Sequence, residues 1–253
     1  MTNKIKYFIG NWKMFGDFRS FKIISKIHHL YSSLSIHKNN NKIVLCVPST
    51  LISFFTNKLK SKFIKIGAQD CHHHEKFGPF TGKVSATMLK SAGAKYIILG
   101  HSENRFNGDT NFQIKEKIKS SLNANLNVIF CIGETHKQKK NNKTFTTIKK
   151  QIYNSIDKKF NFNKILIAYE PVWSIGSGKI PKLLELSQTI KFIKKEFKKL
   201  FKTKKYPIVL YGGSVNDKNI NEISSIKEID GFLIGGASQT SKKFIDIIKN
   251  YYK

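Results

Sequence analysis

The stretch KILIAYE at residues 164–170 decides the fold, because a continuous apolar and β-branched run ends there on a carboxylate. Runs of this length and composition are typical of strands that are buried on both faces, as in a parallel sheet covered by helices. Seven further runs share this character: IKYFIG (5–10), KIVLCVP (42–48), FIKIGA (63–68), YIILG (96–100), NVIFCIG (127–133), PIVLYGG (207–213) and GFLIGG (231–236). The sequence therefore predicts eight strands in one parallel sheet.

The intervals between these runs have the apolar spacing of amphipathic helices. Two clear sets are Leu186, Ile190, Ile193 and Phe197, and Phe244, Ile247, Ile248 and Tyr251. Eight repeats in 253 residues average about 32 residues each, which is the size of one βα unit. We therefore predict an α/β protein in which residues 1–253 form a single (β/α)8 barrel domain. A doubly wound open sheet is the alternative, but no glycine-rich dinucleotide turn follows the first run.

The composition is strongly basic, with 45 Lys and Arg against 16 Asp and Glu and a formal net charge of +29. Only Arg19 and Arg105 are arginines, whereas proteins that read grooves and phosphates favour the bidentate guanidinium. The lysines are also spread along the whole chain. We therefore expect solvated lysine-rich helix faces and no specific nucleic-acid partner, although the positive field favours an anionic substrate.

Several classes of protein are disfavoured by the sequence. No run of 18 apolar residues is present to span a bilayer, and the N-terminal MTNKIKYFIGNWK lacks the apolar stretch of a secretory signal. Cys46, Cys71 and Cys131 are widely spaced beside apolar runs, which favours packed thiols over disulfides. The histidines at 72–74 have no further ligands at a suitable spacing, so no metal site is predicted. We expect a soluble, cytoplasmic protein without a membrane partner.

Residues with versatile chemistry follow the predicted strands. Active sites of (β/α)8 barrels lie at the C-terminal ends of the strands, so these residues are candidates for one shared site. They are Asn11, Lys13, His101, Ser102, Glu103, Glu170, Gly212–Ser214 and Gly235–Gly236. Each residue alone is a weak signal, since an isolated lysine or glutamate is usually a solvated charge. The glycine pairs, each with a helix start behind it, could bring backbone N–H groups to a phosphate, or could simply form tight turns.

The order of motifs along the chain resembles that of the triosephosphate isomerase family. The resemblance spans essentially the whole chain, and its longest motif, AYEPVWSIGSGK at 168–179, is highly specific. The other motifs are NWKM (11–14), QDCH (69–72), TG (81–82), GHSE (100–103), CIGE (131–134), YGGSV (211–215) and GGAS (235–238). The resemblance implies a TIM barrel that interconverts D-glyceraldehyde 3-phosphate and dihydroxyacetone phosphate in glycolysis and gluconeogenesis, without a metal or an organic cofactor.

The resemblance also implies catalytic roles for individual residues. Glu170 would act as the base that moves a proton between adjacent carbons through an enediolate. His101 would be the electrophile at the carbonyl oxygen, with Lys13 and Asn11 completing the oxyanion side. Glu103 is expected near Lys13, where its carboxylate would hold and balance the ammonium group.

The same resemblance also implies which residues bind the substrate phosphate and which loop contacts a second subunit. Residues 171–179 resemble the family's mobile lid, which excludes water when it closes. Phosphate contacts are expected from the backbone of Gly176, Ser214, Gly235 and Gly236. The family dimerises partly by inserting the loop around residues 71–82 into the neighbouring subunit, which places Thr81 near its Lys13 and Asn11. We therefore expect a homodimer.

The chain departs from the family pattern at several positions. Phe15, Lys83 and Asn104 replace the residues that the family has in NWKMNG, TGE and HSERR, and Ser177 replaces a commoner threonine. None of these changes removes a catalytic group. Lys83 and Asn104 replace a glutamate and an arginine that pair across the dimer interface, so we expect a different and weaker polar interface.

Two other functions are compatible with parts of the pattern. Another phosphate-binding barrel, such as a sugar-phosphate isomerase or lyase, would share the glycine turns but not the set of Lys13, His101 and Glu170. A basic barrel that binds nucleic acids or surfaces would show salt-sensitive affinity for polyanions and no turnover.

Overall fold

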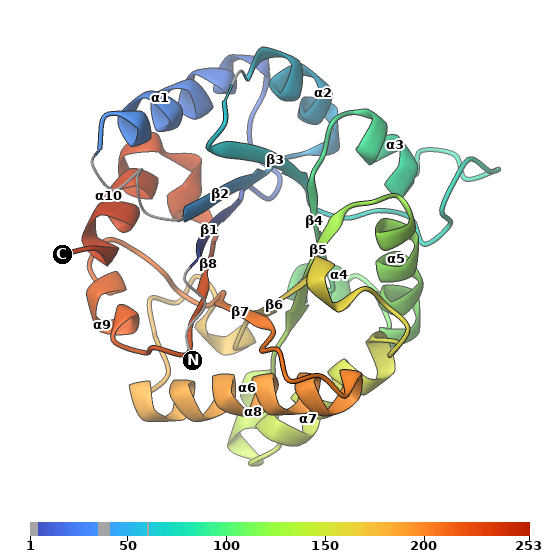
Figure 1. Cartoon of the computed structure of the whole chain (residues 1–253), viewed down its shortest axis with the longest axis vertical. Coiled ribbons are helices and arrows are strands. Elements are labelled where there is room, and N and C mark those ends of the chain that lie inside the picture. The colour runs from blue at the N-terminus through green and yellow to red at the C-terminus, as the bar shows by residue number, and fades with distance from the viewer. Residues whose placement is uncertain (1–4, 35–40, 60) are drawn as a thin grey trace.

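A computed structural model describes residues 5–34, 41–59 and 61–253, and in this part of the chain strands and helices alternate (Figure 1). The strands are β1 (Lys6–Asn11), β2 (Asn41–Cys46), β3 (Ile64–Ala68), β4 (Tyr96–Leu99), β5 (Asn127–Ile132), β6 (Ile165–Tyr169), β7 (Ile208–Tyr211) and β8 (Gly231–Ile234). Each strand pairs in parallel with the next, and β8 pairs with β1. The predicted (β/α)8 barrel is therefore confirmed.

Helices surround this barrel (Figure 1). The α-helices are α1 (Phe21–Ser32), α2 (Ser49–Lys58), α3 (Ala86–Ser91), α4 (Ser102–Phe106), α5 (Asn111–Asn123), α6 (His136–Lys140), α7 (Thr144–Ser155), α8 (Leu183–Phe201), α9 (Ile220–Ser224) and α10 (Ser241–Tyr251). Short 3-10 helices are η1 (Phe18–Ser20), η3 (Phe162–Lys164), η4 (Val172–Ser174) and η5 (Gly236–Gln239). The two predicted amphipathic sets lie in α8 and α10.

Most strand residues are apolar because both faces of the sheet are buried. In β1, Tyr7 and Ile9 belong to a cluster inside the barrel, while Phe8 between them packs in the layer beneath the helices. Consecutive side chains of a strand point to opposite faces, so a strand with two buried faces needs a continuous apolar run. The barrel interior is filled by Tyr7, Ile9, Val44, Cys46, Tyr96, Ile98, Ile129, Cys131, Leu166, Ala168, Leu210 and Leu233.

Several strands end earlier than the apolar runs indicated, and β7 and β8 show why. They end at Tyr211 and Ile234, so the glycine pairs at 212–213 and 235–236 lie beyond the sheet and form turns. The first turn remains attached to the barrel, because the Gly212 N–H donates to the Tyr169 carbonyl at 2.8 Å. The apolar runs thus contain both the strand and the start of the loop that carries the chemistry.

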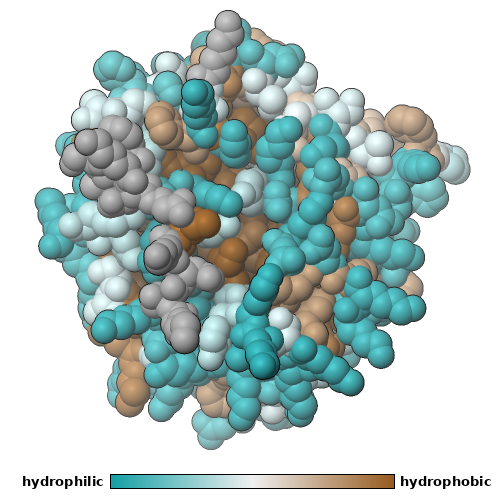
Figure 2. Space-filling view, in the orientation of Figure 1, coloured by the Kyte–Doolittle hydropathy of each residue, from teal (hydrophilic) through white to brown (hydrophobic). Residues whose placement is uncertain are grey.

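The charge of the chain lies mainly at its surface. Hydrophilic side chains cover most of the face shown in Figure 2, and hydrophobic ones are visible mainly near its centre. No helix within the described ranges is long and apolar enough to cross a membrane.

One charged pair, however, is buried between α8 and the sheet. The Lys194 Nζ lies 2.7 Å from the Asp230 Oδ2, and the two side chains are 6% and 0% exposed. The same carboxylate accepts the Val209 N–H at 2.9 Å, and the Asp230 carbonyl accepts the Tyr7 N–H at 3.0 Å. Asp230 therefore connects β7, β8, β1 and α8 at the N-terminal ends of the strands.

We expect Lys194→Met to lower the free energy of unfolding by about 3–5 kcal/mol, because it leaves the Asp230 carboxylate buried without a cation. Lys191→Met is the matched control. The Lys191 Nζ lies 3.3 Å from the Glu228 Oε1, with side-chain exposures of 63% and 29%. Exposed pairs contribute less than about 1 kcal/mol. Urea unfolding followed by circular dichroism measures both variants, and equal losses would contradict this prediction.

Candidate active site

The strand-end residues converge on one cavity of about 260 Å³ at the C-terminal ends of the strands. Its lining consists of Asn11, Lys13, His101, Glu170, Ile175, Gly176, Gly212, Gly213, Ser214, Val215, Asn216, Leu233, Gly235, Gly236 and Ala237. All the residues that the sequence analysis assigned to proton transfer, to the oxyanion and to the phosphate are in this set. Glu103 is outside it, but contacts the cavity through Lys13.

Glu170 and His101 form the buried centre of this cavity. The Glu170 Oε1 lies 3.4 Å from the His101 Nε2, and the side chains are 4% and 7% exposed. On the opposite edge of the ring, the His101 Nδ1 accepts the Glu103 N–H at 3.2 Å, at the start of α4. A ring nitrogen that accepts a hydrogen bond carries no proton, so a neutral imidazole here has its proton on Nε2. His101 can therefore donate a hydrogen bond into the cavity without being charged.

The environment of Glu170 suits a general base. Burial raises the pKa of its carboxyl group above the ordinary value of 4.5, while His101 and Lys13 act in the opposite direction. Two glycines allow this burial. A Cβ on Gly133 would lie 1.8 Å from the Glu170 carbonyl oxygen, and a Cβ on Gly212 would lie 2.7 Å from its Cγ. A carboxylate with a raised pKa is a stronger base near neutral pH.

Lys13 is held in an unusual backbone conformation. Its φ of 56° lies in the left-handed region, which is uncommon for residues other than glycine. The Lys13 N–H donates to the Asn11 Oδ1 at 3.0 Å, and its carbonyl accepts from the Gln69 Nε2 at 2.9 Å. The Lys13 Nζ lies 2.5 Å from the Glu103 Oε1, as the resemblance led us to expect. These contacts fix an ammonium group at the edge of the cavity.

The two glycine turns lead into different structures. The turn after β8 continues directly into η5, which begins at Gly236 without a side-chain cap, so the start of a helical turn lies beside the cavity. The turn after β7 is separated from the next helix, α9, which begins only at Ile220. The expected helix start behind each glycine pair is therefore present after β8 and absent after β7.

The segment 171–179 forms one wall of the cavity. It contains η4, and Gly176 and Gly178 have φ values of 68° and 75°, which favour glycine. The indole N–H of Trp173 donates to the Glu134 Oε1 at 2.9 Å, and the Tyr169 hydroxyl lies 3.2 Å from the Glu134 Oε2. The base of this segment is thus attached to the end of β5, while residues 176–179 are exposed.

Several residues that support the site have no role that the sequence predicts. Gln69 donates to the carbonyls of Lys13 and Cys46, Glu134 anchors Trp173, and the Cys131 thiol contacts Glu170. Gln69 lies in the QDCH motif and Cys131 and Glu134 lie in the CIGE motif, but these motifs do not specify which partners the side chains contact.

The three cysteines are free and buried, as predicted. No group of three or more potential metal ligands occurs among the described residues.

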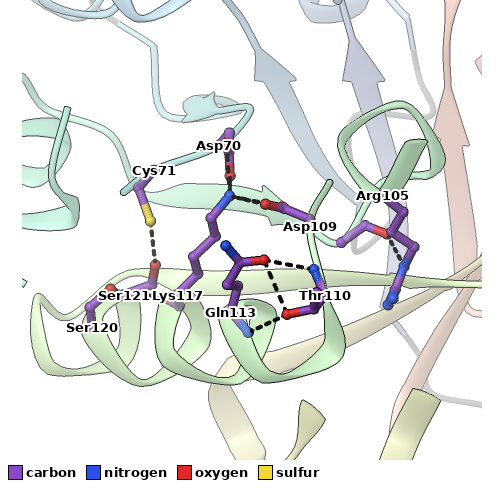
Figure 3. Close-up of polar contacts among 10 residues, drawn as sticks. Asp70, Cys71, Arg105, Asp109, Thr110, Gln113, Lys117, Ser120 and Ser121 are labelled. Atoms are coloured by element: carbon purple, nitrogen blue, oxygen red, sulfur yellow. Dashed lines mark hydrogen bonds and ion pairs between the residues drawn. The ribbon is translucent and has the colours of Figure 1, made fainter. Parts of the chain in front are cut away.

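A second hollow of about 580 Å³ adjoins the site and shares Lys13 with it. In its wall the Lys117 Nζ lies 2.9 Å from the Asp70 Oδ1 and 2.8 Å from the Asp109 Oδ2 (Figure 3). The segment 71–82, between β3 and α3, projects away from the barrel (Figure 1). Large apolar side chains are exposed on both features, with Phe77 on the segment 78% exposed and Met14 beside the hollow fully exposed.

Comparison with known proteins identifies close relatives over almost the full length. The family model described as triosephosphate isomerase matches residues 6–251. The triosephosphate isomerase of Bartonella bacilliformis is 36% identical over 100% of both chains, and that of Dictyoglomus thermophilum is 38% identical over 97% of this chain and 99% of its own. A crystal structure of triosephosphate isomerase from Bartonella henselae superposes with a TM-score of 0.88 at 33% identity, covering 98% of this chain and 99% of the other.

We expect Glu170→Gln to stabilise the folded protein at high pH. The folded-state pKa of Glu170 lies above its unfolded value, so the buried carboxylate opposes folding above the folded pKa, and this cost disappears as the pH falls below the unfolded value. The variant should therefore be more stable than the wild type at about pH 8 and equally stable at about pH 4. Thermal unfolding tests this, with exposed Glu222→Gln as the control, and a variant that is less stable at high pH would contradict it.

Proposed function

The chain belongs to the triosephosphate isomerase family, and on that premise we propose that Glu170 is the base of its reaction, the interconversion of D-glyceraldehyde 3-phosphate and dihydroxyacetone phosphate. The reaction moves a proton between two adjacent carbons, which requires one group that takes the proton and returns it. The Glu170 carboxylate lines the cavity, is nearly inaccessible to water and has a raised pKa. Its contact with the His101 ring, with 3.4 Å between the Glu170 Oε1 and the His101 Nε2, is the single observation that supports this proposal most strongly.

His101 is the proposed electrophile for the oxygen that becomes negatively charged in the enediolate. Its Nε2–H faces the cavity because the Glu103 N–H occupies Nδ1. The Lys13 ammonium group and the Asn11 side chain lie on the same rim and supply the remaining positive potential. Such prearranged donors stabilise a developing oxyanion more than the ground-state carbonyl. Glu103 has a supporting role, since its carboxylate fixes the Lys13 Nζ.

The phosphate group is proposed to bind the backbone of the two glycine turns and the lid. Ser214, Gly235 and Gly236 line the cavity together with Gly176 of the lid, and a Cβ on Gly236 would meet no atom within 4 Å. Glycine allows the close approach of N–H groups to an anion, and η5 adds the potential of a helix start. Closure of residues 171–179 would exclude water from an enediolate that otherwise eliminates phosphate.

The family assignment also decides between the alternatives drawn from the sequence. A sugar-phosphate lyase of another family would not carry this combination of full-length relatives and site residues. The glycolytic role of the family supports a cytoplasmic location, and the match to residues 6–251 supports one domain over residues 1–253.

We expect Glu170→Gln to lower kcat/KM by about a hundred- to ten-thousand-fold, the contribution usual for a general base. The amide keeps the shape of the side chain but cannot accept the proton. A coupled dehydrogenase assay with glyceraldehyde 3-phosphate measures the rate, and Glu222→Gln on the exposed side of α9 should retain wild-type activity. A loss of less than tenfold would remove Glu170 from the role of base.

The homodimer is a further part of the proposal. The hollow beside Lys13 has room for a protruding loop, and the segment 71–82 is such a loop with Phe77 exposed on it. A second copy of the chain would cover Phe77 and Met14, whose exposure in a single chain is unfavourable. Lys83 lines the same hollow, so in the proposed interface a lysine would stand where the family has a glutamate.

We expect the wild type to sediment as a dimer and Phe77→Asp to raise its dissociation constant by at least about tenfold, because a desolvated aromatic anchor is lost. Leu184→Asp is the matched control, since Leu184 is similarly exposed, at 71% against 78%, but lies on α8. Analytical ultracentrifugation over a range of concentrations measures both variants. A monomeric wild type at micromolar concentration would contradict the dimer.

A further inference from the structure

The lid contains, near its start, a serine whose hydroxyl group has every hydrogen-bonding position occupied. Ser174, at the end of η4, is completely buried. Its Oγ donates to the Lys179 carbonyl at 2.5 Å, lies 3.1 Å from the Tyr211 hydroxyl, and accepts the Ser214 N–H at 3.3 Å. A hydroxyl has one hydrogen to donate and two lone pairs. Because that hydrogen goes to Lys179, the Tyr211 hydroxyl must be the donor in the second contact.

The surrounding residues are consistent with this arrangement. A Cβ on Gly213 would lie 2.3 Å from the Tyr211 hydroxyl and 2.7 Å from the Ser174 Oγ, so the contact requires glycine at this position. Burial raises the pKa of Tyr211 to about 12, and its hydroxyl therefore retains the proton that it donates. One side chain thus joins the start of the lid, the end of the lid and the turn after β7.

The Ser214 N–H has two competing acceptors. In the structure it donates to Ser174, whereas the proposed function assigns the same N–H to the substrate phosphate. A single N–H cannot make a full hydrogen bond to both, because it has one hydrogen. Ser174 and the phosphate therefore exclude each other at this donor.

We propose that the Ser174 hydroxyl is a positioning group that occupies the Ser214 N–H in the free enzyme and is displaced from it by the substrate phosphate. This inference rests on the proposed function, since it takes the phosphate site from it. Displacement breaks the contact between the lid and the Ser214 backbone but leaves the hydroxyl bonded to Lys179 and Tyr211. Binding of the phosphate to the Ser214 N–H would then also break the hydrogen bond that joins the lid to the turn after β7.

The test compares Ser174→Ala with Ser155→Ala, each with and without inorganic phosphate. Ser155 is also fully buried, but its hydroxyl lies in α7, 3.3 Å from the Asn111 Oδ1. In Ser174→Ala the amide hydrogens of residues 211–216 should exchange about three- to tenfold faster without phosphate, as expected for the loss of one hydrogen bond. Phosphate should restore their protection, and its inhibition constant against isomerisation should fall by about three- to tenfold. Ser155→Ala should match the wild type in both measurements.

The outcomes separate this inference from the function on which it rests. If phosphate inhibits the wild type but Ser174→Ala changes neither the exchange nor the inhibition constant, the phosphate site stands and the role of Ser174 is overturned. If phosphate neither inhibits the wild type nor protects residues 211–216 in any variant, the phosphate site itself is wrong and the inference falls with it. Gly213→Ala, which pushes the hydroxyl away from the turn, should also speed exchange, so the proposal remains testable if Ser174→Ala does not fold.

Discussion

The backbone hydrogen bonds between β1 and β8 close the sheet, and every functional feature of the molecule depends on this closure. Tyr7 and Ile9 of the first strand pair with Gly231 and Leu233 of the last. The strands approach so closely that a Cβ on Gly231 would lie 2.2 Å from the Tyr7 carbonyl oxygen. Closure brings the C-terminal ends of all the strands to one rim, where residues more than 150 positions apart in sequence can share one cavity.

Closure also sets the electrostatic character of the site. The Glu170 side chain, just after β6, is buried, and Gly212, just after β7, packs directly against its Cγ. The same burial excludes the water that would otherwise screen the contact between Glu170 and His101. Around this centre the segment 171–179 is held by a few side-chain contacts, namely Trp173 with Glu134 and Ser174 with the turn after β7. The barrel therefore holds Glu170 and His101, and the segment 171–179 is attached to it through side-chain hydrogen bonds.

The lysine-rich composition affects how charges are paired inside the protein. Lys117 meets two carboxylates in the hollow next to the site, and Lys194 meets Asp230 below the sheet. The Lys117 ammonium group reaches both oxygens of Asp70 and both oxygens of Asp109, whereas the buried Oδ1 of Asp230 has no hydrogen-bond partner among the described residues. Many of the other lysines in the described ranges are exposed, where their charge is solvated.

The eight strands and their parallel arrangement were predictable from the sequence, because a strand buried on both faces leaves a continuous apolar run. The convergence of the strand-end residues Glu170 and His101 on one cavity was predictable for the same reason, since they stand where such runs end. It did not determine where β7 and β8 stop, since the glycine turns continue the apolar runs. Three properties of the site could be read only from the tertiary structure. They are the nitrogen of His101 that faces the cavity, the burial that raises the pKa of Glu170, and the contacts of the Ser174 hydroxyl. These properties depend on distances between segments that are remote in the chain, and only closure of the barrel fixes those distances.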